Sequence, residues 1–128
     1  MRQLYGSRHF DFMPLTYVLP AEFNEFYTEF LKNKGAWIVK PCASSRGRGI
    51  YVVNNINQVP LDDPCLIAKY VNNPLTVDGF KFDLRIYVAV TSFDPLRVYI
   101  YNEGLTRFAT EKYDKNQTNL ENSYMHLT

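Results

Sequence analysis

The stretch Trp37–Val53, WIVKPCASSRGRGIYVV, places two short apolar runs on either side of a loop of small and cationic residues. Residues 36–40 (AWIVK) and 49–53 (GIYVV) are rich in β-branched and aromatic side chains. They predict two neighbouring strands, joined by the loop Pro41–Arg48.

The loop between these strands has the composition of a phosphate-binding loop. Its small residues let backbone N–H groups surround an anion, while Lys40, Arg46 and Arg48 add positive charge. It does not match the P-loop motif, because the lysine precedes the glycines and no helix begins directly after them. A solvated hairpin loop is the alternative, since Gly, Ser and Arg are ordinary loop residues.

The flanking segments predict a helix and further strands. Apolar residues from Phe23 to Leu31 recur at helical spacing between Pro20 and Gly35, which indicates an amphipathic helix. Residues 15–20 (LTYVLP) are expected to be extended, and residues 65–71 (CLIAKYV) to form a buried strand. The chain before residue 15 is expected to be irregular, and residues 54–64 and 72–79 are expected to be loops.

A hairpin is predicted after residue 79. Apolar and charged residues alternate in residues 80–86, so Lys81, Asp83 and Arg85 are expected on one face, in a row about 13 Å long that could span a triphosphate. Residues 92–96 (SFDPL) predict a turn, and residues 97–104 (RVYIYNEG) a returning strand that ends at Glu103-Gly104. An exposed strand face with a self-satisfied ion pair is the alternative. With more strands than helices, the predicted fold class is α+β.

Composition limits the possible function classes. The formal net charge is +1, so the chain offers no broad basic field for nucleic acid. No long apolar run or signal-peptide pattern is present, so no membrane span is expected. Cys42 and Cys65 lack the spacing of a metal site, and two cysteines are too few for a secreted disulfide scaffold, so an intracellular setting is the default. No metal or catalytic role is assigned to His9 or His126.

Two further places could contact a ligand. Residues 68–71 (AKYV) could present backbone groups to a purine edge and an apolar wall to its face, although core packing with one snorkelling lysine, Lys69, is the alternative. Arg107 could pair bidentately with a carboxylate or phosphate, although a surface arginine after a hairpin is the commoner case.

Taken in order, the motifs WIVKP, SSRGRGI, AKYV, KFDLRIYV, EGLTRFAT and MHLT resemble those of the tubulin–tyrosine-ligase-like family, in particular its polyglutamylating branch. The resemblance covers about Phe10 to Thr128 and implies a partial ATP-grasp fold, in which two α+β lobes hold ATP between them. Residues 1–69 would be part of the central lobe, and residues 70–128 the beginning of the C-terminal lobe. The N-terminal lobe and the magnesium ligands would lie outside this chain, which is therefore expected to be an incomplete catalytic domain, inactive alone.

The resemblance also implies roles for single residues. Contacts with ATP would fall to Lys40, Arg46, Gly47, Ala68, Lys69, Tyr70, Val71, Lys81, Asp83 and Thr128. Lys40 and Lys81 would contact phosphates, residues 46–47 would lie in the loop that closes over them, and residues 68–71 would form the adenine-facing hinge. Arg85 and Arg107 would be catalytic, holding the γ-phosphate or the carboxylate of the incoming glutamate.

The implied activity is ATP-dependent amide formation. A glutamate γ-carboxylate in a tubulin C-terminal tail would be activated as an acyl phosphate, and the α-amine of free L-glutamate would displace phosphate. The expected cofactors are ATP and Mg²⁺, and the expected location is on cytoplasmic microtubules, including those of the cilium, with no nucleic-acid or membrane partner. The alternatives are a nucleotide-binding but inactive relative, a tubulin glycylase, and a nucleic-acid-binding module that uses the RGRG loop.

Overall fold

The computed structural model describes residues 2–43 and 49–114, and its contacts divide them into two compact units. The first unit contains the described residues up to Asn73, and the second begins at Pro74. Each unit has its own β-sheet.

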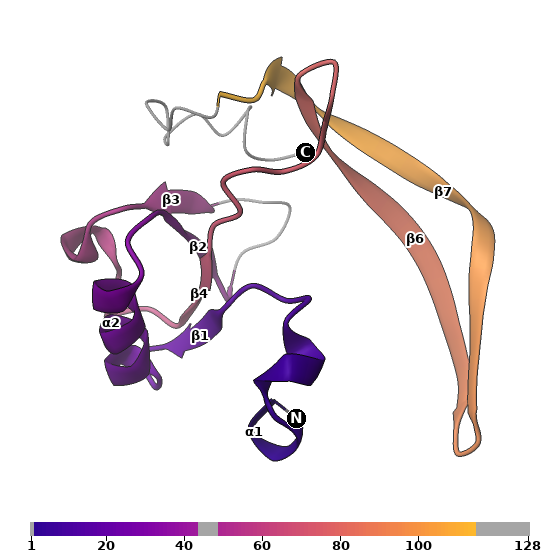
Figure 1. The fold of residues 1–128 in the computed structure, drawn as a ribbon, viewed down its shortest axis with the longest axis horizontal. Helices are drawn as coiled ribbons and strands as arrows, with labels where there is room; N and C mark the ends of the chain where they lie inside the picture. Colours follow the sequence, from indigo (N-terminus) through magenta and orange to yellow (C-terminus); the bar gives the residue numbers. More distant parts are fainter. Residues whose placement is uncertain (1, 44–48, 115–128) are drawn as a thin grey trace. The chain divides into compact units, whose positions relative to one another are not determined.

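The first unit is a four-stranded antiparallel sheet with one longer helix. Its strands are β1 (Thr16–Leu19), β2 (Trp37–Pro41), β3 (Tyr51–Val53) and β4 (Cys65–Lys69), in the spatial order β1-β4-β2-β3. The helix α2 (Phe23–Lys32) connects β1 to β2 and lies beside the sheet in Figure 1. The shorter helical turns are α1 (Arg2–Tyr5), η1 (Ser7–Phe10) and η2 (Ile56–Gln58).

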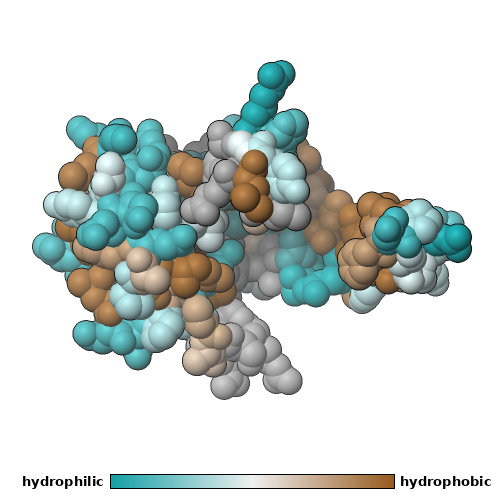
Figure 2. Space-filling model, turned by 90° about the horizontal axis from the view of Figure 1, so that it is seen from below, coloured by the Kyte–Doolittle hydropathy of each residue, from teal (hydrophilic) through white to brown (hydrophobic). Residues whose placement is uncertain are grey.

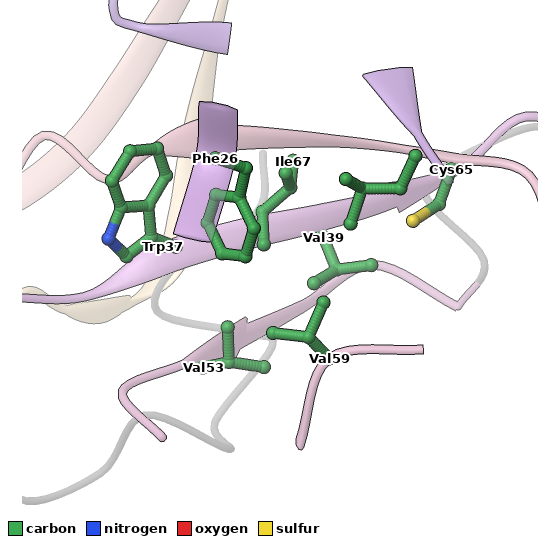
Figure 3. Close-up of a cluster of buried hydrophobic side chains, with 8 residues drawn as sticks. Phe26, Trp37, Val39, Val53, Val59, Cys65 and Ile67 are labelled. Carbon is green, nitrogen blue, oxygen red and sulfur yellow. The ribbon is translucent and has the colours of Figure 1, made fainter. Parts of the chain in front are cut away.

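The core of this unit lies between α2 and one face of the sheet. Phe26 of α2 and Trp37 of β2 are fully buried, and their rings meet edge to face with centroids 5.2 Å apart. Figure 3 shows Phe26 between Trp37 and Ile67. Full burial of such a large apolar side chain contributes about 1.5–3 kcal/mol, so the apolar face of α2 is held by this contact. The buried cluster consists of Leu19, Phe26, Trp37, Val39, Val53, Val59, Cys65 and Ile67.

Most elements expected in this unit are confirmed. The amphipathic helix is α2, the runs at residues 36–40 and 49–53 contain the paired strands β2 and β3, and residues 65–71 contain the buried strand β4. The expectation of an irregular start is wrong in part, because residues 2–10 contain the helical turns α1 and η1. The loop expected at residues 54–64 contains η2, which Asn55 and Gln58 close with a capping box.

The second unit is a three-stranded antiparallel sheet dominated by one long hairpin. Strands β6 (Phe80–Phe93) and β7 (Leu96–Lys112) pair along their length, and β5 (Thr76–Val77) pairs with the start of β6. Figure 1 shows β6 and β7 as an extended, twisted ribbon. Three register shifts interrupt their pairing, between Phe80/Phe82, Ile86/Val88 and Val90/Ser92.

Two expectations for this unit are wrong. The returning strand does not end at Glu103-Gly104 but continues to Lys112. Gly104 lies inside the strand, where a Cβ atom would be only 2.7 Å from the backbone oxygen of Arg85, so glycine here permits a close approach of two strands instead of a turn. The segment at residues 72–79 is not entirely loop, because it contains β5 before the turn at Asp78-Gly79.

The described residues leave both faces of the hairpin largely exposed. The alternation in residues 80–86 is confirmed by the register, in which Phe82 faces Phe108 and Asp83 faces Arg107. Leu84 nevertheless remains 59% exposed. Figure 2 shows hydrophobic side chains at the surface of the hairpin, on the right of the view. The sequence pattern therefore predicts the strand and its two faces, but not the burial of either.

The described residues form a mixed structure of antiparallel sheets and one longer helix, as the α+β class predicts. Within them, no helix has the length and hydropathy that a membrane crossing requires. The ATP-grasp assignment, with residues 1–69 and 70–128 in separate lobes, stays a prediction.

We expect Phe26→Ala to lower the free energy of unfolding by about 3–5 kcal/mol, because the substitution leaves a cavity in the core of the first unit. Urea unfolding followed through the fluorescence of Trp37, the single tryptophan, measures this loss. The matched variant Tyr27→Ala removes a neighbouring ring that is 40% exposed and should cost about 1 kcal/mol or less. Equal losses from the two variants would contradict the placement of Phe26.

We expect Gly104→Ala to loosen the hairpin, because its new methyl group would overlap the backbone oxygen of Arg85. Amide hydrogen exchange should become about tenfold faster in β6 and β7 and should not change in β2 and β4. Thr106→Ala, at an exposed position of the same strand, serves as the control. Unchanged exchange in Gly104→Ala would mean that the two strands do not approach closely at this point.

Candidate functional site

One face of the sheet in the first unit carries a cation on an apolar surface. Lys40 is exposed near the end of β2, and it lies opposite the core face because successive strand residues alternate. The described strand residues on this face are Thr16, Val18, Ile38, Lys40, Val52, Leu66 and Ala68. Lys40 is the charged residue among them. Such a surface suits a ligand that has a flat apolar part and an anionic part.

The loop that follows Lys40 is attached to β4 at its start. The backbone N–H of Cys42 donates to the carbonyl of Pro64 at 3.2 Å. At the far end of the loop, Gly49 has a φ of 70°, which favours glycine. Arg46 and Gly47, expected to close over phosphates, lie outside the described residues, as does Thr128. Their roles stay predictions.

Residues 68–71 lead from β4 into the connection that follows. Ala68 lies on the same face as Lys40, and the N–H groups of Lys69 and Tyr70 donate at 2.8 and 3.0 Å to the carbonyls of Leu15 and Ala36. Val71 is 54% exposed, and none of the described backbone carbonyls accepts a hydrogen bond from its N–H. The backbone of Val71 is thus open to a ligand.

The side chain of Lys69 points away from the Lys40 face. Its Nζ donates to the carbonyls of Asn33 and Lys34 at 2.9 and 3.1 Å, just beyond the C-terminal end of α2. It also lies over the indole ring of Trp37, 5.0 Å from the centroid. Burial lowers the pKa of Lys69, and the Glu29 carboxylate partly opposes that effect. In this arrangement Lys69 can offer a ligand its backbone only.

Two of the expected site residues form an ion pair on the hairpin. Arg107 Nε donates to Asp83 Oδ1 at 2.8 Å, and Nη2 donates to Oδ2, which makes the pair bidentate. The side chains of Arg107 and Asp83 are 45% and 38% exposed, so solvent screens the pair and it adds little to stability. The hydrogen bond to Asp83 raises the pKa of Arg107. Asp83 thus has an ion-pair partner on the next strand, outside the row Lys81, Asp83 and Arg85, and its expected role at an ATP site stays a prediction.

The remaining two hairpin residues lie in the same row. Lys81 pairs in register with Thr76 of β5, and Arg85 pairs with Leu105 of β7. Strand alternation from Asp83 places both side chains on the face of the ion pair. This face of β6 therefore carries Lys81 and Arg85 beside the Arg107–Asp83 pair, and such cations suit an anionic ligand.

The two cationic groups belong to different units, with Lys40 in the first and Lys81, Asp83, Arg85 and Arg107 in the second. Their convergence on one polyanion stays a prediction. In the part of the chain that the structure describes, no group of three or more His, Cys, Asp or Glu side chains could hold a metal ion.

Sequence reasoning missed two features of this region. The apolar surroundings of Lys40 depend on the register between β2 and β4, which pairs segments far apart in the chain. The contact of Lys69 with the end of α2 had one signal, Gly35, which follows the helix. A Cβ atom on Gly35 would lie 3.2 Å from Lys69 Nζ, so this glycine leaves room for the ammonium group.

Comparison with known proteins gives matches along the whole chain. Tubulin polyglutamylase TTLL5 of Mus musculus is 53% identical over 128 residues, which are all of this chain and 10% of that protein. Probable tubulin polyglutamylase TTLL2 of Homo sapiens is 44% identical over 135 aligned positions, covering all of this chain and 22% of that protein. Tubulin monoglutamylase TTLL4 of Mus musculus is 43% identical over 129 aligned positions, covering all of this chain and 11% of that protein.

The chain thus spans between 10% and 22% of the length of these three relatives. The family model described as the tubulin-tyrosine ligase family matches residues 1–128. With the family motifs present from WIVKP to MHLT, the chain belongs to the tubulin-tyrosine ligase family.

Proposed function

We propose that this chain is part of an ATP-dependent ligase that adds glutamate to the C-terminal tails of tubulin. Relatives that match its full length are named tubulin polyglutamylases and a tubulin monoglutamylase, which supports glutamate as the added amino acid. The structural observation that carries the proposal is Lys40, an exposed cation on an apolar sheet face at the start of a glycine- and arginine-rich loop.

The residues of the first unit fit a nucleotide. The apolar side chains of Ile38 and Ala68 suit the face of a purine, and the open N–H of Val71 suits an acceptor on its edge. Lys40 suits a phosphate, with Arg46 and Gly47 proposed to close over the same group. Lys69 and Tyr70 would contribute to the hinge through their backbone, whose direction their own hydrogen bonds fix.

The residues of the second unit suit the reacting anions. Lys81 is proposed to contact ATP phosphates, while Arg85 and Arg107 hold the γ-phosphate or the carboxylate of the incoming glutamate. Guanidinium groups bind carboxylates and phosphates in the same bidentate geometry that Arg107 uses with Asp83. Because that pair is partly exposed, Arg107 could exchange its protein carboxylate for a ligand at small energetic cost.

Bound ATP would supply the leaving group that turns a tail carboxylate into an acceptor for an amine. The lysines and arginines would then neutralise the charge that accumulates as a tail carboxylate, a phosphate chain and free glutamate approach each other. The described residues do not fit a magnesium site, so metal ligands are proposed to come from other residues, and no metal role is assigned here.

The proposed setting follows from the substrate. The two units are proposed to belong to the two lobes of an ATP-grasp fold, and the protein to act on cytoplasmic microtubules, including those of the cilium. The relatives' names mention tubulin, and no finding favours nucleic acid as a partner.

We expect Lys40→Met and Lys81→Met each to lower the rate of glutamate addition at least about 100-fold, because each removes a cation proposed to contact a transferring phosphate chain. The test uses the full-length natural protein with ATP, magnesium, glutamate and tubulin. Mass spectrometry of the tubulin tails counts the added glutamates.

The matched control is Lys32→Met, which removes an exposed lysine from the last turn of α2 and should keep activity within about twofold. Full activity of Lys81→Met would remove the phosphate assignment of that residue. Mass steps of glycine instead of glutamate would identify a glycylase. Nucleotide binding without any addition to tubulin would identify an inactive relative.

A further inference from the structure

Lys69 fixes the end of β4 through its side chain and its backbone together. Its ammonium bonds to two carbonyls beyond α2, and its N–H bonds to the carbonyl of Leu15 before β1. It also pairs in register with Trp37, whose ring lies under the ammonium. One residue thus connects α2, β2 and the segment before β1 at the point where β4 ends.

The direction of this side chain follows from strand alternation. In β4 the residues Cys65 and Ile67 face the core under α2, and Lys69 has the same parity. Ala68, one residue earlier, faces the opposite side with Lys40. Lys69 therefore directs a cation toward the helix while its neighbours border the proposed nucleotide face.

The electrostatics favour this position of the ammonium. The C-terminal end of a helix carries partial negative charge, so a cation just beyond it, where Asn33 and Lys34 lie, is stabilising. The indole face adds a cation–π contact. Burial opposes the charge and lowers the pKa of Lys69, and the nearby Glu29 carboxylate opposes only part of that effect.

We infer that Lys69 is a positioning residue for purine recognition: its ammonium, held by the end of α2, sets the path of the backbone that leads to the open N–H of Val71. One residue, Tyr70, separates Lys69 from that donor. The N–H groups of Lys69 and Tyr70 are already used inside the fold, whereas the N–H of Val71 donates to none of the described backbone carbonyls. This inference rests on the proposed nucleotide-binding function and adds a residue that acts on the base through the backbone.

The test separates recognition of the base from recognition of the phosphates. Isothermal titration of the full-length natural protein measures Kd for two probes, magnesium ATP and magnesium tripolyphosphate, at a temperature where circular dichroism shows each variant folded. Lys69→Met keeps the apolar stem and removes the ammonium. We expect it to raise Kd for ATP about tenfold and to change Kd for tripolyphosphate less than about twofold, because hydrogen bonds to the base depend on backbone direction.

Two further variants complete the comparison. Lys69→Arg keeps a cation that can reach both carbonyls and should hold Kd for ATP within about threefold of the natural protein. Lys32→Met removes a charge from the same end of α2 and should change neither Kd by more than about twofold. If Lys69→Met does not fold, Lys69→Gln gives the same comparison with a smaller expected loss, since its amide still donates to one carbonyl.

Each outcome decides between distinct conclusions. A selective loss of ATP affinity in Lys69→Met, restored in Lys69→Arg, supports the inference. Unchanged ATP affinity, or an equal loss for both probes, overturns it, because a purely structural role would affect the two probes alike. If the natural protein binds neither probe, the proposed nucleotide function itself is overturned, and the inference falls with it.

Discussion

The packing of α2 on the sheet through Phe26 and Trp37 is the contact on which the first unit depends. Because it buries one face of β2 and β4, strand alternation must place the intervening residues on the other face. Lys40 is exposed for that reason, and Lys69 lies under the helix for the same reason. A one-residue slip of β2 would place Lys40 in the core, and a one-residue slip of β4 would place Lys69 on the opposite face. The core contact therefore decides which lysine can meet a ligand.

The second unit depends in the same way on a constraint of the backbone. At Gly104 the strands β6 and β7 approach too closely for any side chain, and this fixes the register that brings Arg107 opposite Asp83 and Leu105 opposite Arg85. The bidentate ion pair then follows from register, since two oppositely charged residues face each other across the strands. Because the pair is partly exposed, it adds little stability. Its main effect is to hold the Arg107 side chain in a defined orientation.

The elements that could be predicted from the sequence are those with a local period. The helix from Phe23, the strands around Trp37 and Val52, and the alternation from Phe80 to Ile86 all have one. The return strand was expected to stop at Gly104 because glycine most often marks a turn, and only the neighbouring backbone of Arg85 shows why it does not. Likewise Arg107 could be proposed as an anion-binding residue, but not as the partner of Asp83, since their pairing depends on two register shifts between the turn and this pair. In both units, the sequence patterns thus do not predict how strands far apart in the chain are paired.

The two lysines show how one residue type takes opposite roles within one sheet. Lys40 and Lys69 are on adjacent strands, and both match motifs in which a ligand contact is expected. Lys40 remains exposed beside apolar side chains, where a cation keeps its hydration until an anion replaces it. The ammonium of Lys69 is bonded to two backbone carbonyls just beyond α2 and lies over an indole face, and partial burial lowers its pKa. A cation bonded in this way cannot also bind a phosphate without leaving those carbonyls unsatisfied, so in the proposed nucleotide site Lys69 would act through the backbone that it holds.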